Sequence, residues 1–373
     1  MSGAAVHVAG RGAVTPLGDG TRGLLDAIFA GASALRPLER LAGTDCLTRV
    51  AAEHRKGELA SLASPNELPR VTALRAAREA LAEGGEPERR SLGFVLSTTK
   101  GDLSGVQGEG QGLGNPGDLA ERLAAELEIG GRRIAVSCAC ASGLSATALA
   151  ARWIECGELE RVLVVGVDAL SPFVLRGFSS LLALDSGPCR PFDARRKGLS
   201  LGEAAGALLL SAEPAEGIGV RVVGWGESND ANHITGPSRD GEGLFLAAQR
   251  ALARAELAAA GVDYLHLHGT GTDYNDAMEA QAVARLFDGP SAPASGTKAQ
   301  TGHTLGAAGI VESLIAIEAL RRGLAPANVG LEEVGVHSAL DLVREPRPLG
   351  SARHALKLAA GFGGINAALV FER

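Results

Sequence analysis

The chain has 373 residues, of which 46% are hydrophobic and 21% charged, so it is long enough for a large core in two or three domain-sized units. Its net charge of −7 and its aromatic content of 3% argue against nucleic-acid binding through a basic surface or through stacked bases. It contains no apolar run of about 18 residues and no signal-peptide pattern, so we expect a cytoplasmic protein without membrane spans.

Short apolar segments alternate with longer segments of helical character. Many of the short segments are continuously apolar, as expected for strands that are buried on both faces. The strand-like segments are Val6–Ala9, Gly93–Ser97, Ile134–Ser137, Val162–Val167, Ala207–Leu210, Val220–Val223, Leu265–His268 and Ala367–Phe371. The helix-like segments are Thr21–Ala30, Leu74–Glu83, Asp118–Leu127, Leu144–Cys156, Gly243–Ala260, Asp276–Phe287 and Val311–Arg321. This alternation predicts an α/β fold with largely central sheets.

The polar segment 212–219 divides the chain into two halves of similar make-up, residues 1–213 and residues 214–373. Each half carries a strand, a tight turn and a buried helix in succession. No short-period repeat is present in either half, which argues against a solenoid or a propeller.

Cys140 stands where a β-branched, strand-like stretch meets a long apolar helix. A thiol at the start of a helix faces unpaired backbone N–H groups and the positive end of the helix dipole. Both features favour the thiolate, which is the nucleophilic form of cysteine. The alternative is a buried, inert cysteine, which is the more common fate of a free thiol. Residues further along the chain favour the nucleophile.

Two histidine motifs further along the chain favour Cys140 as a nucleophile. Leu265–Thr272 ends a strand and enters a Gly/Thr turn at His268. Thr297–Gly309 places Lys298 and His303 just before an apolar helix. A single histidine is more often structural, but one cysteine and two histidines at three such junctions are unlikely to coincide by chance. The small residues around them would let a thioester or a backbone approach closely.

The five cysteines are odd in number and scattered, so we expect no disulfide framework and reduced thiols. They are Cys46, Cys138, Cys140, Cys156 and Cys189. The pair Cys138 and Cys140 could be drawn with His266 and His268 as a zinc site. Structural zinc sites usually separate their cysteines by two to four residues, and a C-x-C turn sends the two side chains apart. We therefore expect no metal site.

The segment Gly112–Gly117 matches the G-x-G-x-x-G pattern of dinucleotide-binding turns. That fingerprint must follow a strand and precede an acidic residue about 20 positions later. Here a Gly-rich loop precedes it, and Ser137 and Cys138 stand near the acidic position. We interpret the segment as a mobile surface loop.

With these residues placed, the chain resembles the β-ketoacyl-acyl-carrier-protein synthases, which are condensing enzymes of the thiolase fold. The resemblance covers nearly the whole chain, and its motifs are specific in combination. They are Val14–Gly18, Arg190–Gly206, Asp230–Pro237, His268–Glu279 and Gly361–Ala367. It implies an α/β thiolase fold with two pseudo-symmetric halves that form a layered αβαβα core. Residues 1–213 would be the half that carries the nucleophile, and residues 214–373 the half that carries both histidines.

The resemblance implies a decarboxylative Claisen condensation. Cys140 would take an acyl group from a thioester, and the backbone N–H groups of Cys140 and Phe362 would form the oxyanion hole. His268 and His303 would donate from Nε2 to the malonyl thioester carbonyl while CO₂ leaves. A neutral imidazole can donate there without strong Coulombic trapping of the product.

The family also implies supporting roles. Lys298 is expected to pair with Glu279 and to orient the histidines. Thr270 and Thr272 would hydrogen-bond the pantetheine arm, with structural turn hydroxyls as the alternative. Phe362 could gate the acyl pocket. Asp276 and Glu279 are expected to be structural rather than chemical.

Three departures from the family pattern concern the substrate. Lys197 replaces the usual aspartate of the R-D-G motif, and the stretch from Lys100 to Ile134 is shorter and richer in glycine than in typical fatty-acid members. That stretch shapes the acyl pocket in the family, so chain-length preference does not carry over. The runs Ser97–Gly101, Arg176–Ser180 and Gly198–Glu203 are more similar to synthases of aryl-polyene and related pigments.

The expected partners are an acyl carrier protein and a second subunit, either an identical chain or a paralogous ketosynthase or chain-length factor. No cofactor of the enzyme itself is expected, because phosphopantetheine belongs to the carrier protein. The densest basic cluster, Arg195, Arg196 and Lys197, is the predicted docking site for the acidic carrier protein. The alternative is that one of the arginines pairs internally with Asp193 or Glu203.

Three other functions compete. A non-catalytic chain-length factor shares this fold, but such subunits usually lose the nucleophilic cysteine, which Cys140 retains. A thiolase that uses coenzyme A would need a second cysteine near His303, and no cysteine follows Cys189. A ketosynthase of the initiating type would have asparagine in place of one of the two histidines. All three are disfavoured by Cys140, His268 and His303 together.

Overall fold

The computed structural model describes residues 4–55, 67–102, 114–215, 217–287, 289–336 and 339–373. Twelve strands of this part form one mixed sheet. The first half of the chain supplies β1 (His7–Thr15), β2 (Gly18–Asp19), β5 (Gly93–Ser97), β6 (Arg133–Val136), β7 (Arg161–Asp168) and β8 (Ala204–Ser211). The second half supplies β9 (Arg221–Asn229), β10 (Tyr264–His266), β11 (Pro293–Ser295), β13 (Asp341–Leu342), β15 (His354–Gly361) and β16 (Ile365–Glu372).

The two halves of the sheet repeat one strand order. It runs β6-β5-β7-β8-β1 in the first half and β11-β10-β15-β16-β9 in the second. In each half the three outer strands pair in parallel with one another. The fourth strand, β8 or β16, is antiparallel to both of its neighbours. β1 and β9 meet at the antiparallel pair His7 and Arg221, which joins the halves. The segment between β8 and β9 contains the predicted boundary at residues 213 and 214.

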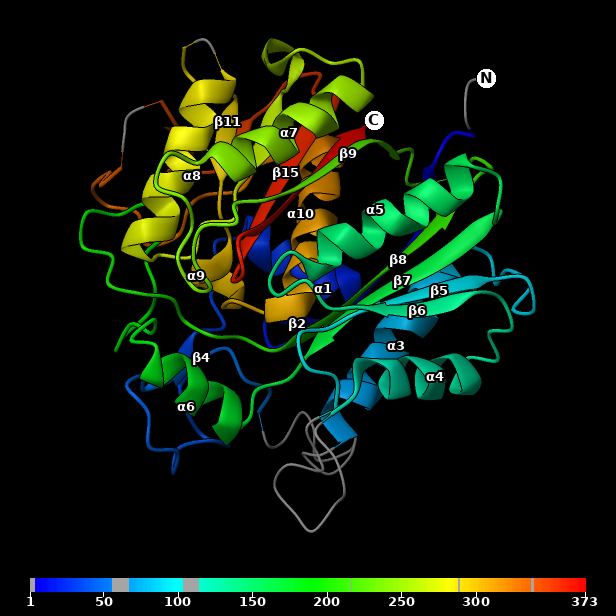
Figure 1. The fold of residues 1–373 in the computed structure, drawn as a ribbon, viewed down its shortest axis with the longest axis horizontal. Helices are drawn as coiled ribbons and strands as arrows, with labels where there is room; N and C mark the ends of the chain where they lie inside the picture. Colours follow the sequence, from blue (N-terminus) through cyan, green and yellow to red (C-terminus); the bar gives the residue numbers. More distant parts are fainter. Residues whose placement is uncertain (1–3, 56–66, 103–113, 216, 288, 337–338) are drawn as a thin grey trace.

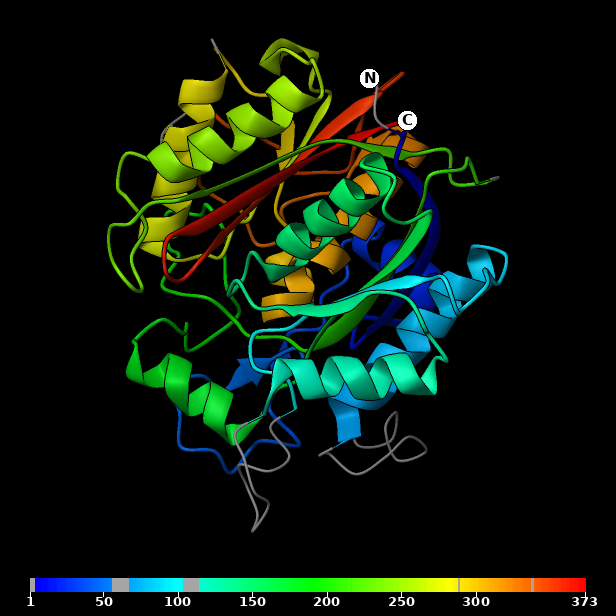
Figure 2. The same ribbon diagram turned by 45° about the vertical axis from the view of Figure 1, so that its right-hand side comes forward.

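Helices cover both outer faces and fill the space between the halves, so the molecule has five layers (Figures 1 and 2). The outer helices are α3 (Leu68–Glu83) and α4 (Pro116–Glu126) on the first half, and α7 (Glu242–Arg254) and α8 (Asp273–Leu286) on the second. The central helices are α5 (Ser142–Glu155) and α10 (Ala308–Arg322). This arrangement confirms the expected layered α/β fold. β5 and β8 are buried throughout, as their continuous apolar sequences predict.

Close contact between the central helices brings the two halves of the site together. A Cβ atom on Gly143 would lie 2.8 Å from the Cα atom of Gly309, so both helices need glycine where they cross. Both glycines lie in the first turn of their helices. The residues that precede α5 and α10, among them Cys140 and His303, therefore meet. Within the described ranges, no helix is long and apolar enough to cross a membrane.

Short strands such as β11 and β13 were not predicted, and three further differences concern longer elements. β15 was not predicted, because its alanines, glycine and lysine have low strand propensity and only its place between β10 and β16 makes it a strand. α6 (Pro172–Ser180) was also missed, although Ser171 caps it and Pro172 begins it. The helix predicted over Gly243–Ala260 ends at Arg254, since Glu256 adopts a positive φ of 52°.

The glycine-rich stretch after Lys100 is described only in part. Residues 103–113, and with them Gly112 of the G-x-G-x-x-G pattern, lie outside the described residues. The last two residues of that pattern, Pro116 and Gly117, begin α4 and so do not belong to the loop predicted for them, and the N-cap side chain, Asn115, accepts a hydrogen bond from the backbone N–H of Gly117.

Candidate active site

Cys140 lies in a tight turn immediately before α5. Ala139 adopts a positive φ of 48°, which is uncommon for a residue with a side chain. The Ser142 hydroxyl fixes the turn, because it accepts the backbone N–H of Cys138 at 2.8 Å and donates to the carbonyl of Ala139. A Cβ atom on Gly361 would lie 3.1 Å from the Cys140 backbone nitrogen, so glycine lets the end of β15 approach the turn. The backbones of Cys140 and Phe362 thereby share one region.

The resting state of Cys140 differs from the sequence prediction. Its side chain is buried, and burial raises the pKa of the Cys140 thiol to about 12, although Lys298 acts in the opposite direction. Burial disfavours the charged form of the thiol and so opposes the effect of the helix start. Burial thus favours the thiol in the resting protein, against the thiolate that the helix start alone predicts. His303 Nε2 lies 3.0 Å from Cys140 Sγ, so this histidine can stabilise the negative charge that develops on the sulfur during acyl transfer.

The hydrogen bonds at Nδ1 assign the tautomer of both histidines. Nδ1 of His303 accepts the backbone N–H of Leu305 at 3.3 Å, and Nδ1 of His268 lies 3.3 Å from Lys298 Nζ, which can only donate. In the neutral ring the proton is then on Nε2 in both residues. Burial, followed by the charge of Lys298, holds the pKa of His268 and of His303 well below the usual range. Both rings are therefore neutral donors.

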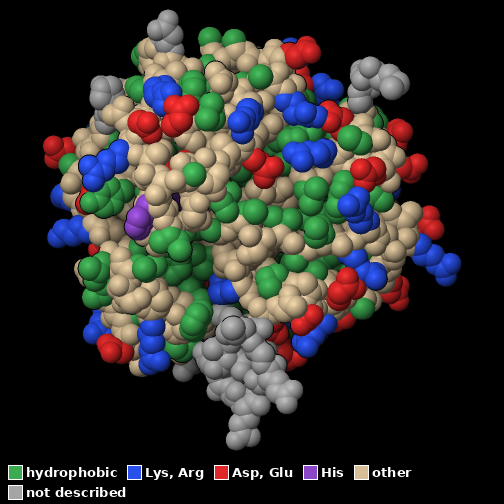
Figure 3. Space-filling view, in the orientation of Figure 1, with side chains coloured by type: hydrophobic (Ala, Val, Ile, Leu, Met, Phe, Trp, Pro, Cys, Tyr) green, Lys and Arg blue, Asp and Glu red, His purple; other side chains and the backbone are tan. Residues whose placement is uncertain are grey.

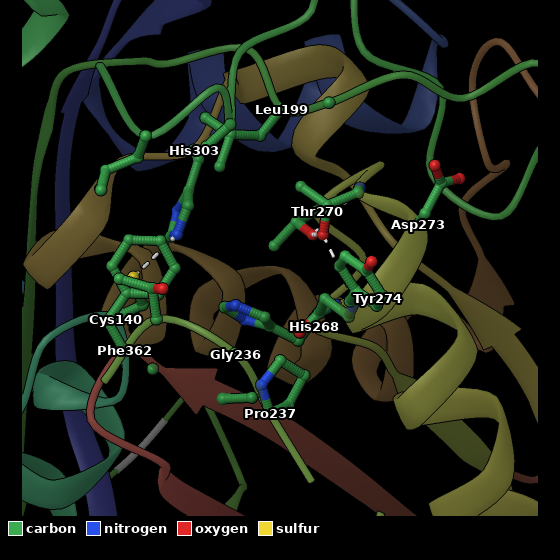
Figure 4. Close-up of a pocket in the computed structure, with 18 of the residues that line it drawn as sticks. Cys140, Leu199, Gly236, Pro237, His268, Thr270, Asp273, Tyr274, His303 and Phe362 are labelled. Atoms are coloured by element: carbon green, nitrogen blue, oxygen red, sulfur yellow. Dashed lines mark hydrogen bonds between the residues drawn. The ribbon is translucent and has the colours of Figure 1, made fainter. Parts of the chain in front are cut away.

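The two histidines and the cysteine converge on one cavity. The rings of His268 and His303 meet edge to face with centroids 5.4 Å apart. Figure 4 shows both rings beside Cys140, and Phe362 over the cysteine. The structure thus brings together the three residues that the sequence predicts to react, from three separate turns.

Lys298 has a different partner from the one predicted. Its Nζ lies 2.5 Å from Glu312 Oε1 on α10 and also donates to the backbone carbonyl of His268. The predicted pair with Glu279 is wrong, because Glu279 accepts the backbone N–H groups of His268 and Gly269 instead. The carboxylate of Glu279 is therefore committed to the turn that carries His268.

Asp276 completes the support of this turn. It accepts the backbone N–H groups of Thr270 and Gly271, both at 3.1 Å, and that of Phe192 at 2.7 Å. Asp276 and Glu279 of α8 therefore hold backbone N–H groups, whereas Asp273, the third acidic residue of this helix, lines the cavity.

Two charged residues near the site were missed in the sequence. Glu312 and Lys357 are buried, and Lys357 Nζ lies 2.7 Å from Glu312 Oε2. A signal was present in both cases. Glu312 interrupts the apolar helix α10, and Lys357 interrupts the apolar strand β15. A charge inside such an element must find a partner, because an unpaired buried charge is very costly.

The cavity at this site has a volume of about 680 Å³. Cys140, His268 and His303 line it, whereas Cys138 and His266 of the alternative zinc site are not among the described residues that do. Thr270 and Thr272 also line it, with their hydroxyl oxygens 2.9 Å apart.

An aromatic pair forms one wall. Phe362 stacks on Phe178 of α6 with ring centroids 5.8 Å apart. At the opening, the side chains of Leu182 and Tyr274 are strongly exposed. Figure 3 shows hydrophobic side chains gathered on this face between α6 and α9 (Lys298–Thr301), with basic side chains around them.

The three predicted docking residues do not form one exposed patch. The side chain of Arg196 is only 9% exposed and donates to the backbone carbonyls of Asp193 and Gly335, which disfavours a role in docking. Arg195 pairs with Asp193 at 3.2 Å and with Glu332 at 2.7 Å, as the alternative interpretation expected. Lys197 is exposed and lines the cavity.

Comparison with known proteins gives concordant matches. Residues 4–215 match the family model of the β-ketoacyl synthase N-terminal domain, and residues 220–332 match that of the C-terminal domain. The chain is 32% identical to 3-oxoacyl-[acyl-carrier-protein] synthase 2 of Rhizobium meliloti (strain 1021), over 99% of this chain and 98% of that protein. It is 30% identical to the protein of the same name from Vibrio cholerae serotype O1, with full coverage of both chains (100% each).

Solved structures are similar over the same length. A β-ketoacyl synthase from Burkholderia phymatum STM815 superposes with a TM-score of 0.89 at 30% identity, and the match covers 99% of each chain. The ketosynthase ApeO in complex with its chain length factor ApeC, from Xenorhabdus doucetiae, gives a TM-score of 0.82 at 28% identity, over 99% of this chain and 98% of that one.

Proposed function

The chain belongs to the β-ketoacyl synthase family, and from that premise we propose how its own residues carry out a decarboxylative condensation on acyl-carrier-protein thioesters. One observation carries the proposal. Cys140 Sγ lies 3.0 Å from His303 Nε2, and the ring of His268 lies beside it in the same cavity. A nucleophile and two neutral donors are the groups that acyl transfer and decarboxylation require.

In the first step, Cys140 takes the acyl group. The Cys140 sulfur attacks the thioester carbonyl, the bond from that carbon to the pantetheine sulfur breaks, and the thiol proton leaves with the pantetheine thiol. His303 Nε2–H donates to the sulfur while it carries negative charge. The backbone N–H groups of Cys140 and Phe362 would hold the oxyanion, which develops only in the transition state.

In the second step, His268 and His303 donate from Nε2 to the carbonyl oxygen of a malonyl thioester. Loss of CO₂ leaves an enolate at that position, and its carbon attacks the acyl carbon on Cys140. The bond from the acyl carbon to Cys140 sulfur then breaks, and the cysteine takes one proton from water. Because both rings are neutral, they stabilise the enolate by hydrogen bonds. A fixed cation would in addition bind the product tightly by Coulombic attraction.

The other site residues bind and orient. Thr270 and Thr272 would hydrogen-bond the pantetheine arm. Phe362, stacked on Phe178, would gate the acyl end of the cavity. Lys298 would hold His268 in its donating tautomer, while Asp276 and Glu279 keep the turn in place. The enzyme needs no cofactor in this scheme, since phosphopantetheine arrives on the carrier protein.

The test of this function is the intact mass of the protein after incubation with a panel of acyl-carrier-protein thioesters. We expect at least one member of the panel to add a single acyl mass and to release the free carrier protein. The same panel identifies the acyl group. A non-catalytic chain-length factor, which is the second candidate, would gain no acyl mass from any member.

Lys197 is the remaining candidate for carrier-protein docking. It is exposed at the cavity, and with Arg195 and Arg196 engaged elsewhere it is the predicted residue that can meet an acidic partner. Replacing Lys197 with glutamate should raise KM for the carrier-protein thioester by about fivefold, which corresponds to about 1 kcal/mol. KM for a small pantetheine thioester should stay the same, and added salt should reduce the difference.

The matched control is Arg22→Glu, which changes the net charge equally on an exposed helix position away from the cavity. It should leave both KM values unchanged. An equal rise in KM for both substrates in the Lys197 variant would mean that Lys197 contacts the pantetheine arm or shapes the cavity, and would refute a docking role.

We further propose that the exposed edge of β6 contacts a second subunit, identical or paralogous. Ile134 is 42% exposed on this edge, which is unusual for a large apolar residue on a strand with an unpaired side. The native mass in solution tests the pairing, and a monomer in the presence of every ketosynthase paralogue would contradict it. We place the reaction in the cytoplasm, which fractionation of cells would test.

A further inference from the structure

Lys357 is a buried cation that the mechanism has not yet used. It lies in the middle of β15, beside His266 of β10 and Leu369 of β16, and its side chain is fully buried. Its neighbours Leu356 and Leu358 pack into the core on the outer side of the sheet, whereas Ala355 and Ala359 face the central helices. Because side chains alternate along a strand, Lys357 projects towards α10, with small alanines on either side of it.

On that face Lys357 meets Glu312. Its Nζ lies 2.7 Å from Glu312 Oε2, as an ion pair whose angle is poor for a hydrogen bond, and it donates to the backbone carbonyls of Leu267 and Leu358. The other oxygen of Glu312 holds Lys298, whose Nζ reaches Nδ1 of His268. Buried charges thus form a continuous line from Lys357 to His268.

The contact between Lys298 Nζ and His268 Nδ1 is the most sensitive to the position of Lys298. Lys298 has three N–H donors, and all three have partners: Glu312, the backbone carbonyl of His268, and Nδ1 of His268. The last is the longest, at 3.3 Å. If Glu312 were held by Lys298 alone, its carboxylate could rotate, and a small shift of Lys298 Nζ would break the bond to Nδ1 first.

We propose that Lys357 is a positioning residue for decarboxylation, which acts through Glu312 and Lys298 to keep His268 neutral with its proton on Nε2. Lys357 fixes one oxygen of Glu312 and adds a second positive charge behind the histidine. A protonated His268 would place a proton on Nδ1, directly against Lys298, so both cations oppose that state. The inference rests on the proposed function, because it assigns a role within the decarboxylation step.

The charged and titratable groups around His268 bear on any pH dependence. They are Lys298 from α9, His303, Glu312 from α10, Lys357 from β15, Asp276 and Glu279 from α8, and Cys140. The charge of Lys357 lowers the pKa of His268, and it also lowers that of Glu279, which burial raises to about 7. Removing Lys357 raises the pKa of both groups. Protonation then sets in at higher pH, so the acid limb of the decarboxylation profile moves upward.

The test uses the full chain with Lys357 replaced by methionine, which keeps the length but removes the charge, or by glutamine, which keeps a donor. Enzyme first loaded with an acyl group is mixed with a malonyl-carrier-protein thioester that is labelled in the free carboxylate, and labelled CO₂ is counted over a single turnover. We expect CO₂ release to fall by roughly 10- to 100-fold, the scale for a slightly misplaced group. Acyl loading should stay within about twofold. The acid limb should move up by roughly half a pH unit or more.

Arg11→Met is the matched control. Arg11 is also a buried cation on a central strand, and it pairs with Glu83 of α3 and with Glu318, which is on α10 as Glu312 is but does not line the cavity. This variant should lose a similar amount of thermal stability and keep the wild-type acid limb. If the methionine variant does not fold, the glutamine variant carries the test.

The possible outcomes distinguish failure of the positioning role of Lys357 from failure of the proposed function. Wild-type CO₂ release and an unmoved acid limb in a folded Lys357 variant would overturn the positioning role while the proposed function stands. Equal loss of loading and CO₂ release, with an unmoved limb, would likewise overturn it and show a structural role alone. Absence of CO₂ release from acyl-loaded wild-type enzyme would instead refute the proposed function.

Discussion

Replacing Cys140 with alanine should abolish acyl loading and reduce condensation to background. The reason is that Cys140 supplies the atom to which the acyl group is bonded, and no second thiol is among the described residues that line the cavity. The measurement is intact mass, with peptide mapping, after incubation with the thioester that loads the wild-type protein. No other single substitution in this chain should have a larger effect on condensation.

Cys138→Ala is the matched control for this prediction. Cys138 lies two residues away in the same turn, is partly exposed, and is not among the described residues that line the cavity. It should load at the wild-type rate. Acyl mass that persists in the Cys140 variant, and maps to the peptide of Cys138, would show that the nucleophile has been misassigned.

The two histidines should separate the half-reactions. Replacing His268 with alanine should lower CO₂ release by at least ~10²-fold, the scale for loss of one preorganised donor, while acyl loading continues. Replacing His303 with alanine should lower both rates, because its Nε2 lies 3.0 Å from Cys140 Sγ and stabilises the sulfur during acyl transfer. Rapid-quench measurements of acyl-enzyme and of CO₂ give the two rates separately.

His354→Ala serves as the control, since His354 is half-buried beside Glu372 and does not line the cavity. It should leave both rates unchanged. Normal CO₂ release in the His268 variant would show that this histidine does not hold the malonyl carbonyl. Normal loading in the His303 variant would show that the contact with Cys140 has no part in acyl transfer.

The reactive residues could be predicted from sequence because each stands in a local pattern. A strand that ends in small residues before an apolar helix places Cys140 in a turn, and the Gly/Thr turns do the same for His268 and His303. Each of these features depends on a few neighbouring residues. The layered fold followed in the same way from continuous apolar strands that alternate with helices.

Features that depend on distant residues could not be predicted in this way. The pKa of Cys140 is governed by burial beneath two halves of the molecule, which opposes the local effect of the helix start. Lys298 pairs with Glu312 rather than with Glu279, because the chain path sets Glu279 against backbone N–H groups. The charge of Arg196 suggested a docking residue, yet its guanidinium donates to the backbone carbonyls of Asp193 and Gly335.

The central claim is that an acyl group on Cys140 is extended by a carbon nucleophile that forms as CO₂ leaves. The most direct test is a single turnover of isolated acyl-enzyme with a malonyl-carrier-protein thioester. We predict equal amounts of CO₂, of β-ketoacyl-carrier protein and of protein restored to its unmodified mass at Cys140. Release of CO₂ with the acyl group still on Cys140, or loss of the acyl group without a β-ketoacyl product, would contradict the account.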